Sequence, residues 1–113
     1  MSGDRRPSFW SDILGAAEGQ EIVGVVIRDE NYYDGIDPGD PRSVPEDATN
    51  RVLSAAHAET LLNYAYDSGF GGADCHAVYA WTPDQVLFVG EYDGSTHIAA
   101  VPRHATDCKP VMT

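Results

Sequence analysis

Basic residues are scarce in this chain of 113 residues. Seven lysines and arginines stand against 18 aspartates and glutamates, which gives a formal net charge of -11. A nucleic-acid-binding surface needs a basic patch that displaces counterions from phosphates, and anionic lipid also attracts basic segments. The composition therefore argues against direct binding to nucleic acid and against a membrane-surface protein. It favours solubility, a basic partner or electrostatic imitation of a polyanion.

Cysteines and long apolar runs are also rare. Cys75 and Cys108 are the two cysteines of the chain, too few for a disulfide-built scaffold. The longest apolar run, Ile22 to Ile27, is far shorter than the roughly 20 residues that span a bilayer. Residues 1–7 lack the apolar core of a signal peptide. We expect a cytoplasmic protein.

Apolar residues make up 42% of the chain, enough for one packed core. Residues 1–113 are predicted to form a single acidic domain of the α+β class. The prediction is an antiparallel sheet with a C-terminal three-stranded meander, one long helix and a short N-terminal helix. The expected helices are Pro7 to Leu14 and Ala48 to Tyr66, and the expected strands are Glu21 to Arg28, His76 to Trp81, Val86 to Tyr92 and Thr96 to Val101.

Three features support these helices and the first strand. Ser8 or Ser11 is a candidate cap of the short helix. Asp47 or Thr49 is a candidate cap of the long helix, whose apolar stripe includes Leu61 as an expected core residue. The first strand is apolar at both odd and even positions, which face opposite sides of a sheet, and this predicts burial on both faces.

Two turns set the register of the last three strands. Thr82-Pro83-Asp84-Gln85 has proline at its favoured position, and Asp93-Gly94 is a strong hairpin signal. This register places Tyr79 opposite Phe88 and Val89 opposite Ile98. One face then carries Val78, Ala80, Leu87, Val89, Ile98 and Ala100, and the other carries Tyr79, Trp81, Val86, Phe88, Ala99 and Val101, with Tyr92 and His97 toward one end.

Both faces of this predicted sheet are apolar, so both need a cover. The aliphatic face, with Leu87 at its core, is expected to pack against the long helix. The N-terminal helix, with Phe9 and Trp10, is a candidate cover for the aromatic face, and a partner or ligand is the alternative. The candidate binding residues on that face are Tyr79, Trp81, Phe88, Tyr92 and His97.

Residues 29–47 are predicted to form a long acidic loop, which is either a binding element or a surface insertion without a role. Its candidate binding residues are Asp29, Glu30, Asp34, Asp37 and Asp40. The spacing does not match an EF-hand, because Tyr33 occupies the fifth position and Asp40, not a glutamate, the twelfth. We predict no metal site here.

No combination of residues indicates catalysis. Among the histidines, His57, His76 and His97 are acid-base candidates, and Glu91 is expected opposite His76, but such cross-strand pairs are commonly simple neighbours. His104 and Cys108 have metal-ligand spacing without a paired-cysteine motif. We therefore predict a non-enzymatic protein without a metal or cofactor.

The segments Asp74 to Thr82 and Phe88 to Arg103 resemble small uncharacterised proteins encoded by tailed phages of actinobacteria. The resemblance implies a phage accessory protein in the host cytoplasm that binds a host or virion protein. It assigns no functional residue. The leading hypothesis is thus a protein-interaction module, with a homo-oligomer as an open alternative. An acidic DNA mimic that inhibits a nucleic-acid-binding enzyme, and a small-molecule or nucleotide binder using the aromatic residues, are the other hypotheses.

Overall fold

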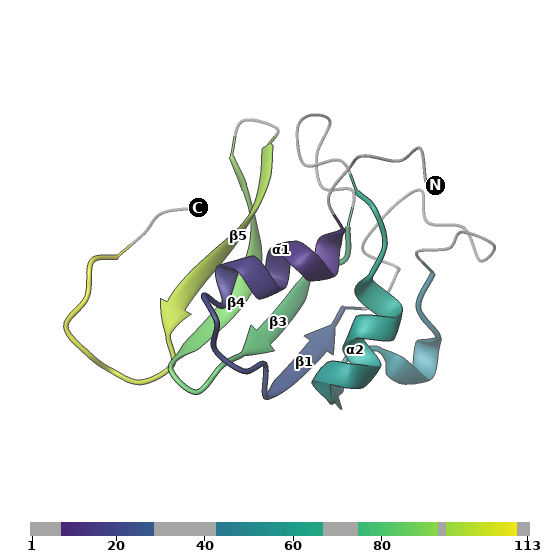
Figure 1. Ribbon diagram of the computed structural model, residues 1–113, viewed down its shortest axis with the longest axis horizontal. Helices are drawn as coiled ribbons and strands as arrows, with labels where there is room; N and C mark the ends of the chain where they lie inside the picture. Colours follow the sequence, from purple (N-terminus) through teal and green to yellow (C-terminus); the bar gives the residue numbers. More distant parts are fainter. Residues whose placement is uncertain (1–7, 29–42, 67–74, 93–94, 111–113) are drawn as a thin grey trace.

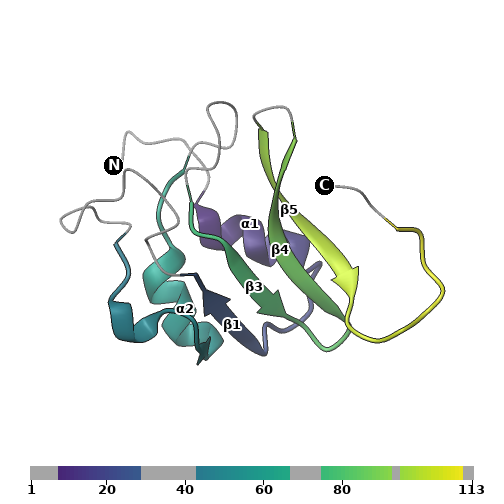
Figure 2. The ribbon, with the colours of Figure 1, turned by 180° about the vertical axis from the view of Figure 1, so that it is seen from behind.

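The protein is a two-layer α+β structure in which five antiparallel strands are covered by two helices. The computed structural model describes residues 8–28, 43–66, 75–92 and 95–110. The strands follow the order β2-β1-β3-β4-β5 across the sheet. Helices α1 and α2 lie in front of the sheet in Figure 1 and behind it in Figure 2. Both described helices therefore pack on the same face.

Helix α1 spans Phe9–Ala16 and confirms the predicted short N-terminal helix. Ser8 is its N-cap, because the Ser8 Oγ accepts a hydrogen bond from the Ser11 N–H at 2.9 Å. Phe9, Trp10 and Ile13 are buried against the sheet. The helix thus covers the aliphatic face, and the expectation that it covers the aromatic face is wrong.

The predicted long helix over residues 48–66 is also wrong. This segment holds a 3-10 turn, η2 (Glu46–Ala48), then strand β2 (Val52–Leu53), and then helix α2 (Ala55–Leu62). Asn50 has a φ of 58°, a left-handed conformation that no helix continues. The cap is Ser54, whose Oγ accepts from the His57 N–H at 3.2 Å. Pairing with β1 therefore outweighs helix propensity before Ser54.

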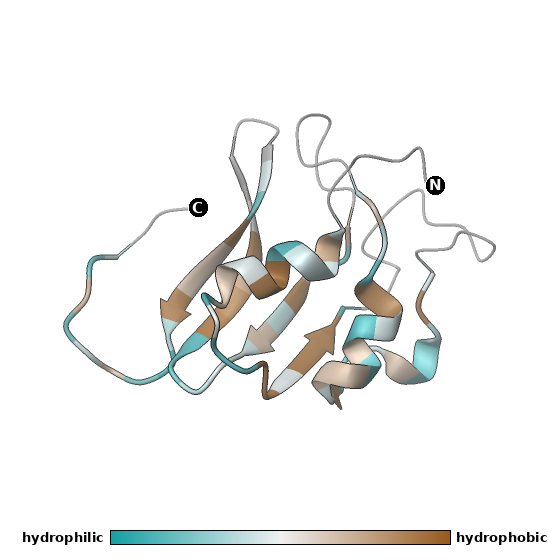
Figure 3. Ribbon diagram, in the orientation of Figure 1, coloured by the Kyte–Doolittle hydropathy of each residue, from teal (hydrophilic) through white to brown (hydrophobic). Residues whose placement is uncertain are grey.

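Strand β1 spans Gly24–Ile27, inside the predicted range. Val25 and Ile27 are buried under the helices, whereas Val26 is only partly buried. Burial on both faces was predicted, and the structure shows it for one face. Figure 3 shows β1 as almost uniformly hydrophobic and β3 as alternating, so uniform hydrophobicity here does not mean two covered faces.

The last three strands are β3 (Val78–Trp81), β4 (Gln85–Tyr92) and β5 (Ser95–Pro102). They pair in sequence order within the larger sheet, and Tyr79 lies opposite Phe88, as predicted. Val89 lies opposite Ile98, also as predicted, although both are only partly buried. The Asp93-Gly94 turn lies outside the described residues.

The Thr82–Gln85 turn is fixed by the threonine side chain. Thr82 Oγ1 accepts hydrogen bonds from the N–H groups of Asp84 and Gln85, at 3.3 and 2.9 Å. The Thr82 N–H donates to the Gln85 carbonyl at 2.9 Å, which makes these two residues the first rung of the β3–β4 ladder. The expected turn therefore sets the observed register.

The core lies between the helices and the aliphatic face of the sheet. It joins buried residues of α1, α2 and four strands, including Leu62 and Leu87. Leu61, the core residue predicted from the long helix, is only partly buried, while Leu62 is fully buried. The buried residues of α2 are Ala58 and Leu62.

Candidate functional site

One face of the sheet is left open by both described helices, and we call it the open face. Its residues point away from α1 and α2 because they alternate with the buried residues of each strand. The register aligns Val26, Tyr79, Phe88 and Ala99 in one row across four strands. The open face comprises Val26, Val52, Tyr79, Trp81, Val86, Phe88, Ala99 and Val101.

Side chains on the open face are apolar, and most are partly or fully accessible, although Ala99 is buried. Tyr79 is 56% exposed, Val52 72% and Val101 39%. Trp81 and Phe88 are partly exposed. Directly behind them, Ala80 and Leu87 are at most 1% exposed. Both faces of these strands thus carry hydrophobic side chains, but the described helices cover only one of the two faces.

Two aromatic rings of the open face are in contact, and a third stands on the neighbouring strand. The centroids of Tyr79 and Trp81 lie 6.1 Å apart at an interplanar angle of 66°, an edge-to-face geometry that aromatic pairs favour. Phe88 is the cross-strand neighbour of Tyr79. Because these residues stand on paired strands, their backbone positions are held rigidly by the sheet, which reduces the entropy lost on binding.

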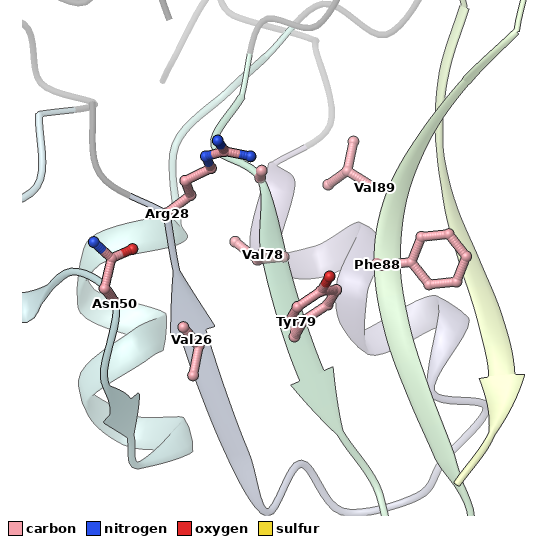
Figure 4. Close-up of a pocket in the computed structure, with 8 residues that line it drawn as sticks. Val26, Arg28, Asn50, Val78, Tyr79, Phe88 and Val89 are labelled. Atoms are coloured by element: carbon pink, nitrogen blue, oxygen red, sulfur yellow. The ribbon is translucent and has the colours of Figure 1, made fainter. Parts of the chain in front are cut away.

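A shallow hollow of about 350 Å³ lies on the open face beside Tyr79. It is lined by Val26, Arg28, Asn50, Ala77, Val78, Tyr79, Phe88 and Val89. Figure 4 shows the Arg28 guanidinium lying near the start of β3, with Tyr79 and Phe88 farther along the sheet. The hollow therefore combines an apolar floor with one cationic side chain.

Two arginines lie near the open face of this chain, whose net charge is -11. Arg28 continues β1 and donates its backbone N–H to Ala77, at 2.9 Å. Arg103 follows β5, and its guanidinium donates to the Thr82 carbonyl at 3.1 Å. The open-face positions inside the described strands hold no acidic residue, but Asp84, directly opposite Arg103, lies beside the same end of the sheet. The face is thus apolar with arginines near two of its ends.

A second hollow, of about 330 Å³, lies between α1 and β5. Its lining includes Asp12, Tyr66, Thr96 and His97. The Tyr66 hydroxyl donates to Asp12 Oδ2 at 2.5 Å. Burial and then this hydrogen bond raise the pKa of Tyr66, so the phenol stays protonated and joins α1 to the segment after α2. This pair is a structural tie.

The histidines proposed as acid-base groups lie apart from one another. His57 is exposed on α2, and His97 lines the hollow beside α1. His76 is buried just before β3, where Tyr64 Oη accepts from its backbone N–H at 3.0 Å and lies 2.8 Å from its Nδ1. The side chain of Glu91, its expected neighbour, lies outside the described residues.

Several predicted binding residues also lie outside the part of the chain that the structure describes. They are Asp29, Glu30, Asp34, Asp37, Asp40 and the side chain of Tyr92. Tyr79, Trp81 and Phe88 stand on the open face, and the register places His97 on the same side of β5 as Ala99 and Val101, although His97 also lines the hollow beside α1. Among the described residues, no three His, Cys, Asp or Glu side chains gather as metal ligands. Cys75 is buried and Cys108 is exposed.

Sequence reasoning missed Val52, Asn50 and Arg28 as neighbours of the aromatic group. The signal was weak, because β2 has only two residues and lies in a segment read as helix. Val26 and Arg28 fall on the same side of the predicted first strand, but the sequence did not show which strands would pair with it.

No helix among the described residues is long and apolar enough to cross a membrane. Comparisons with protein-family models, curated proteins and solved structures give no match to this chain.

Proposed function

We propose that this protein is a non-enzymatic binding module whose open face takes an apolar segment of a protein partner. The observation that carries the proposal is Tyr79, which is 56% exposed at the centre of an aromatic sheet face that neither described helix covers. Soluble monomers rarely expose a contiguous apolar patch without using it. Tyrosine and tryptophan are also the residues that dominate binding energy at interfaces.

The charge of the open face narrows the chemistry of this partner. Arg28 and Arg103 lie at its ends, while the chain as a whole carries a net charge of -11. A partner segment with apolar residues flanked by carboxylates would place those carboxylates beside the arginines. A basic segment would meet two cations instead. We therefore favour an acidic, amphipathic segment as the occupant.

The resemblance to phage proteins supplies a biological setting for this proposal. In that setting the chain is an accessory protein, and the partner segment belongs to a host or virion protein. The proposal does not depend on this setting, because the open face is a property of the fold. The partner's chemistry is the part that binding experiments address directly.

A display selection of random peptides against the immobilised full chain tests the proposal. Selected peptides should be apolar and acidic, and their binding is then measured by titration calorimetry. Tyr79→Ser should weaken binding by about 2–4 kcal/mol, as expected for an interface hot spot. Arg28→Gln should weaken binding less and reduce its dependence on salt.

The matched control is Glu59→Gln on the exposed surface of α2, which should leave peptide binding unchanged. Circular dichroism checks that each variant stays folded. Unchanged binding by folded Tyr79→Ser would contradict the proposal. If binding then fell on neutralising Asp29, Glu30 and Asp34, attention would move to the acidic loop and a polyanion-mimic function.

The hollow beside Tyr79 favours a small-molecule binder as a second candidate. Its volume of about 350 Å³ lies within the usual range for ligand sites, roughly 300–1,000 Å³. Two aromatic rings and the Arg28 guanidinium suit a ligand with a planar ring and an anionic group. Nucleoside monophosphates are suitable probes, and amide chemical shifts of Val26 and Tyr79 should move on addition. Shifts that are absent at millimolar nucleotide would exclude this candidate.

A further inference from the structure

Strand β5 forms one edge of the sheet, and this edge is long. It spans eight residues, Ser95–Pro102, and pairs with β4 in an unbroken register from Tyr92–Ser95 to Gln85–Pro102. The opposite edge is β2, which has only two residues. The two edges therefore differ in how much backbone they offer to another strand.

The phase of the β4–β5 ladder shows which backbone groups point outward. The Arg103 N–H donates to the Asp84 carbonyl at 2.8 Å. Because inward and outward groups alternate along an antiparallel strand, Val101, Ala99 and His97 also face β4. The N–H and C=O groups of Thr96, Ile98 and Ala100 then face away from the sheet. Pro102 occupies the next outward position and has no N–H to offer.

Most of this edge lacks the devices that usually prevent edge pairing, and the exception is Pro102 at its end. Proteins protect exposed edges with charged side chains, proline or bulges. From Ser95 to Val101 the strand has no Asp, Glu, Lys, Arg or Pro, and its described register contains no bulge. Among the described residues, β5 pairs with β4 and is the last strand of the sheet. Its outward groups are thus a template for one more strand.

We propose that this strand is β5 of a second copy of the chain, paired antiparallel about a two-fold axis at Ile98. In this register Ile98 faces Ile98 of the second copy, and Thr96 faces its Ala100. Each outward N–H of these residues then meets a carbonyl of the other copy. Moving the axis to Ala100 would place Pro102 opposite Ile98 and lose a donor. Pro102 thus favours the Ile98 register over the Ala100 register.

Side chains near the axis fit this arrangement. Ile98 is only partly buried and lines the hollow of about 330 Å³ between α1 and β5. The α1 side of this hollow includes Ser11 and Gly15, whose small side chains leave room at the edge. Facing residues of paired strands share a side of the sheet, so Ile98 of the second copy would lie against Ile98 beside this hollow. Both isoleucines would become more buried.

Electrostatics gives the dimer a distinctive salt response. Two copies that each carry a net charge of -11 repel one another, whereas the paired strands themselves hold no carboxylate between Ser95 and Val101. Added salt screens the repulsion and leaves the backbone hydrogen bonds in place. Dimerisation should therefore strengthen with salt.

The dimer would also enlarge the open face. A two-fold axis perpendicular to the sheet keeps both helix layers on one side and both open faces on the other. One continuous ten-stranded sheet would then present two copies of the Tyr79 group side by side. This inference does not rest on the proposed function, since the edge and the open face are separate surfaces.

Sedimentation equilibrium of the full chain, from low micromolar to near-millimolar concentration, tests the dimer. The unaltered chain should shift from monomer to dimer, more readily at high salt. Ala100→Pro removes an outward N–H without removing a hydrogen bond to β4, and should weaken the dimer at least about tenfold. Ala100→Ser keeps the N–H and should leave the dimer intact.

Amide hydrogen exchange in the unaltered chain provides a second measurement that needs no variant. Exchange at Thr96, Ile98 and Ala100 should slow as concentration rises, while His97 and Ala99 are protected throughout. A chain that stays monomeric, with outward amides exchanging at a concentration-independent rate, would overturn the proposal. So would a dimer that folded Ala100→Pro retains undiminished. If Ala100→Pro does not fold, the exchange measurement decides.

Discussion

Leu87 and Phe88 are adjacent on β4, yet they meet different surroundings. Leu87 is 1% exposed beneath the two helices, whereas Phe88 is partly exposed on the open face. The strand alternates its side chains between faces, so one peptide unit separates the core from the candidate binding surface. Hydrophobicity alone does not separate the two faces of this sheet. What separates them is the placement of α1 and α2.

The largest loss of stability is expected from a substitution on the face of the sheet that the helices cover. Leu87→Ala should lower the free energy of unfolding by about 2–5 kcal/mol, because it leaves a cavity that the surrounding core fills only in part. Phe88→Ala removes a larger side chain but should cost less than half as much, since Phe88 is already partly hydrated. Urea denaturation measures both. Equal losses would show that the open face is as well covered as the helix face.

A smaller effect is expected at the hydrogen bond between Tyr66 and Asp12. Tyr66→Phe removes the donor to the carboxylate and should cost about 1–3 kcal/mol. The matched variant on the open face, Tyr79→Phe, should change stability by less than about 0.5 kcal/mol. Denaturant midpoints at neutral pH compare the two. A neutral Tyr66→Phe would show that the tie is not needed for packing.

The same variant predicts a difference at alkaline pH. Burial raises the pKa of Tyr66 above the ordinary value of 10.0, so the folded protein keeps the phenolic proton after the unfolded chain has lost it. This contribution to stability is complete below pH 10 and is lost as pH rises toward the folded pKa. Tyr66→Phe should therefore lose less stability than the unaltered chain above pH 10, as measured by thermal melting. Parallel pH profiles would contradict this assignment.

Local signals in the sequence were sufficient for part of this fold. The Thr82–Gln85 turn predicted the β3–β4 register, and the β4–β5 pairs predicted from Asp93-Gly94 are observed on either side of that turn. Of the two candidate caps, Ser8 and Ser11, Ser8 is the N-cap of α1. These features depend on residues close in the chain, where turn geometry and capping fix the backbone. The sequence therefore predicted local register better than the position of helices.

Long-range contacts account for the parts that the sequence did not predict. Residues 48–66 have a helical apolar pattern, but Leu53 pairs with Val25 and places β2 at the sheet edge. No local signal shows that a two-residue strand will form there. The side of the sheet taken by α1 is likewise a choice of tertiary packing. For the candidate site, the aromatic group was predicted, while Arg28 and Asn50 depend on the unpredicted pairing of β1.

The smallest expected effect lies on the open face at β2. Val52 is 72% exposed, and its neighbour Leu53 is buried under the helices. Val52→Thr keeps a β-branched side chain suited to a strand and should change the free energy of unfolding by less than about 0.5 kcal/mol. Leu53→Ala, one residue away, should cost at least about 2 kcal/mol. Urea denaturation of both variants compares the faces at the far edge of the sheet. A large loss from Val52→Thr would show that the Val52 side chain is covered, and that the open face does not extend beyond β1.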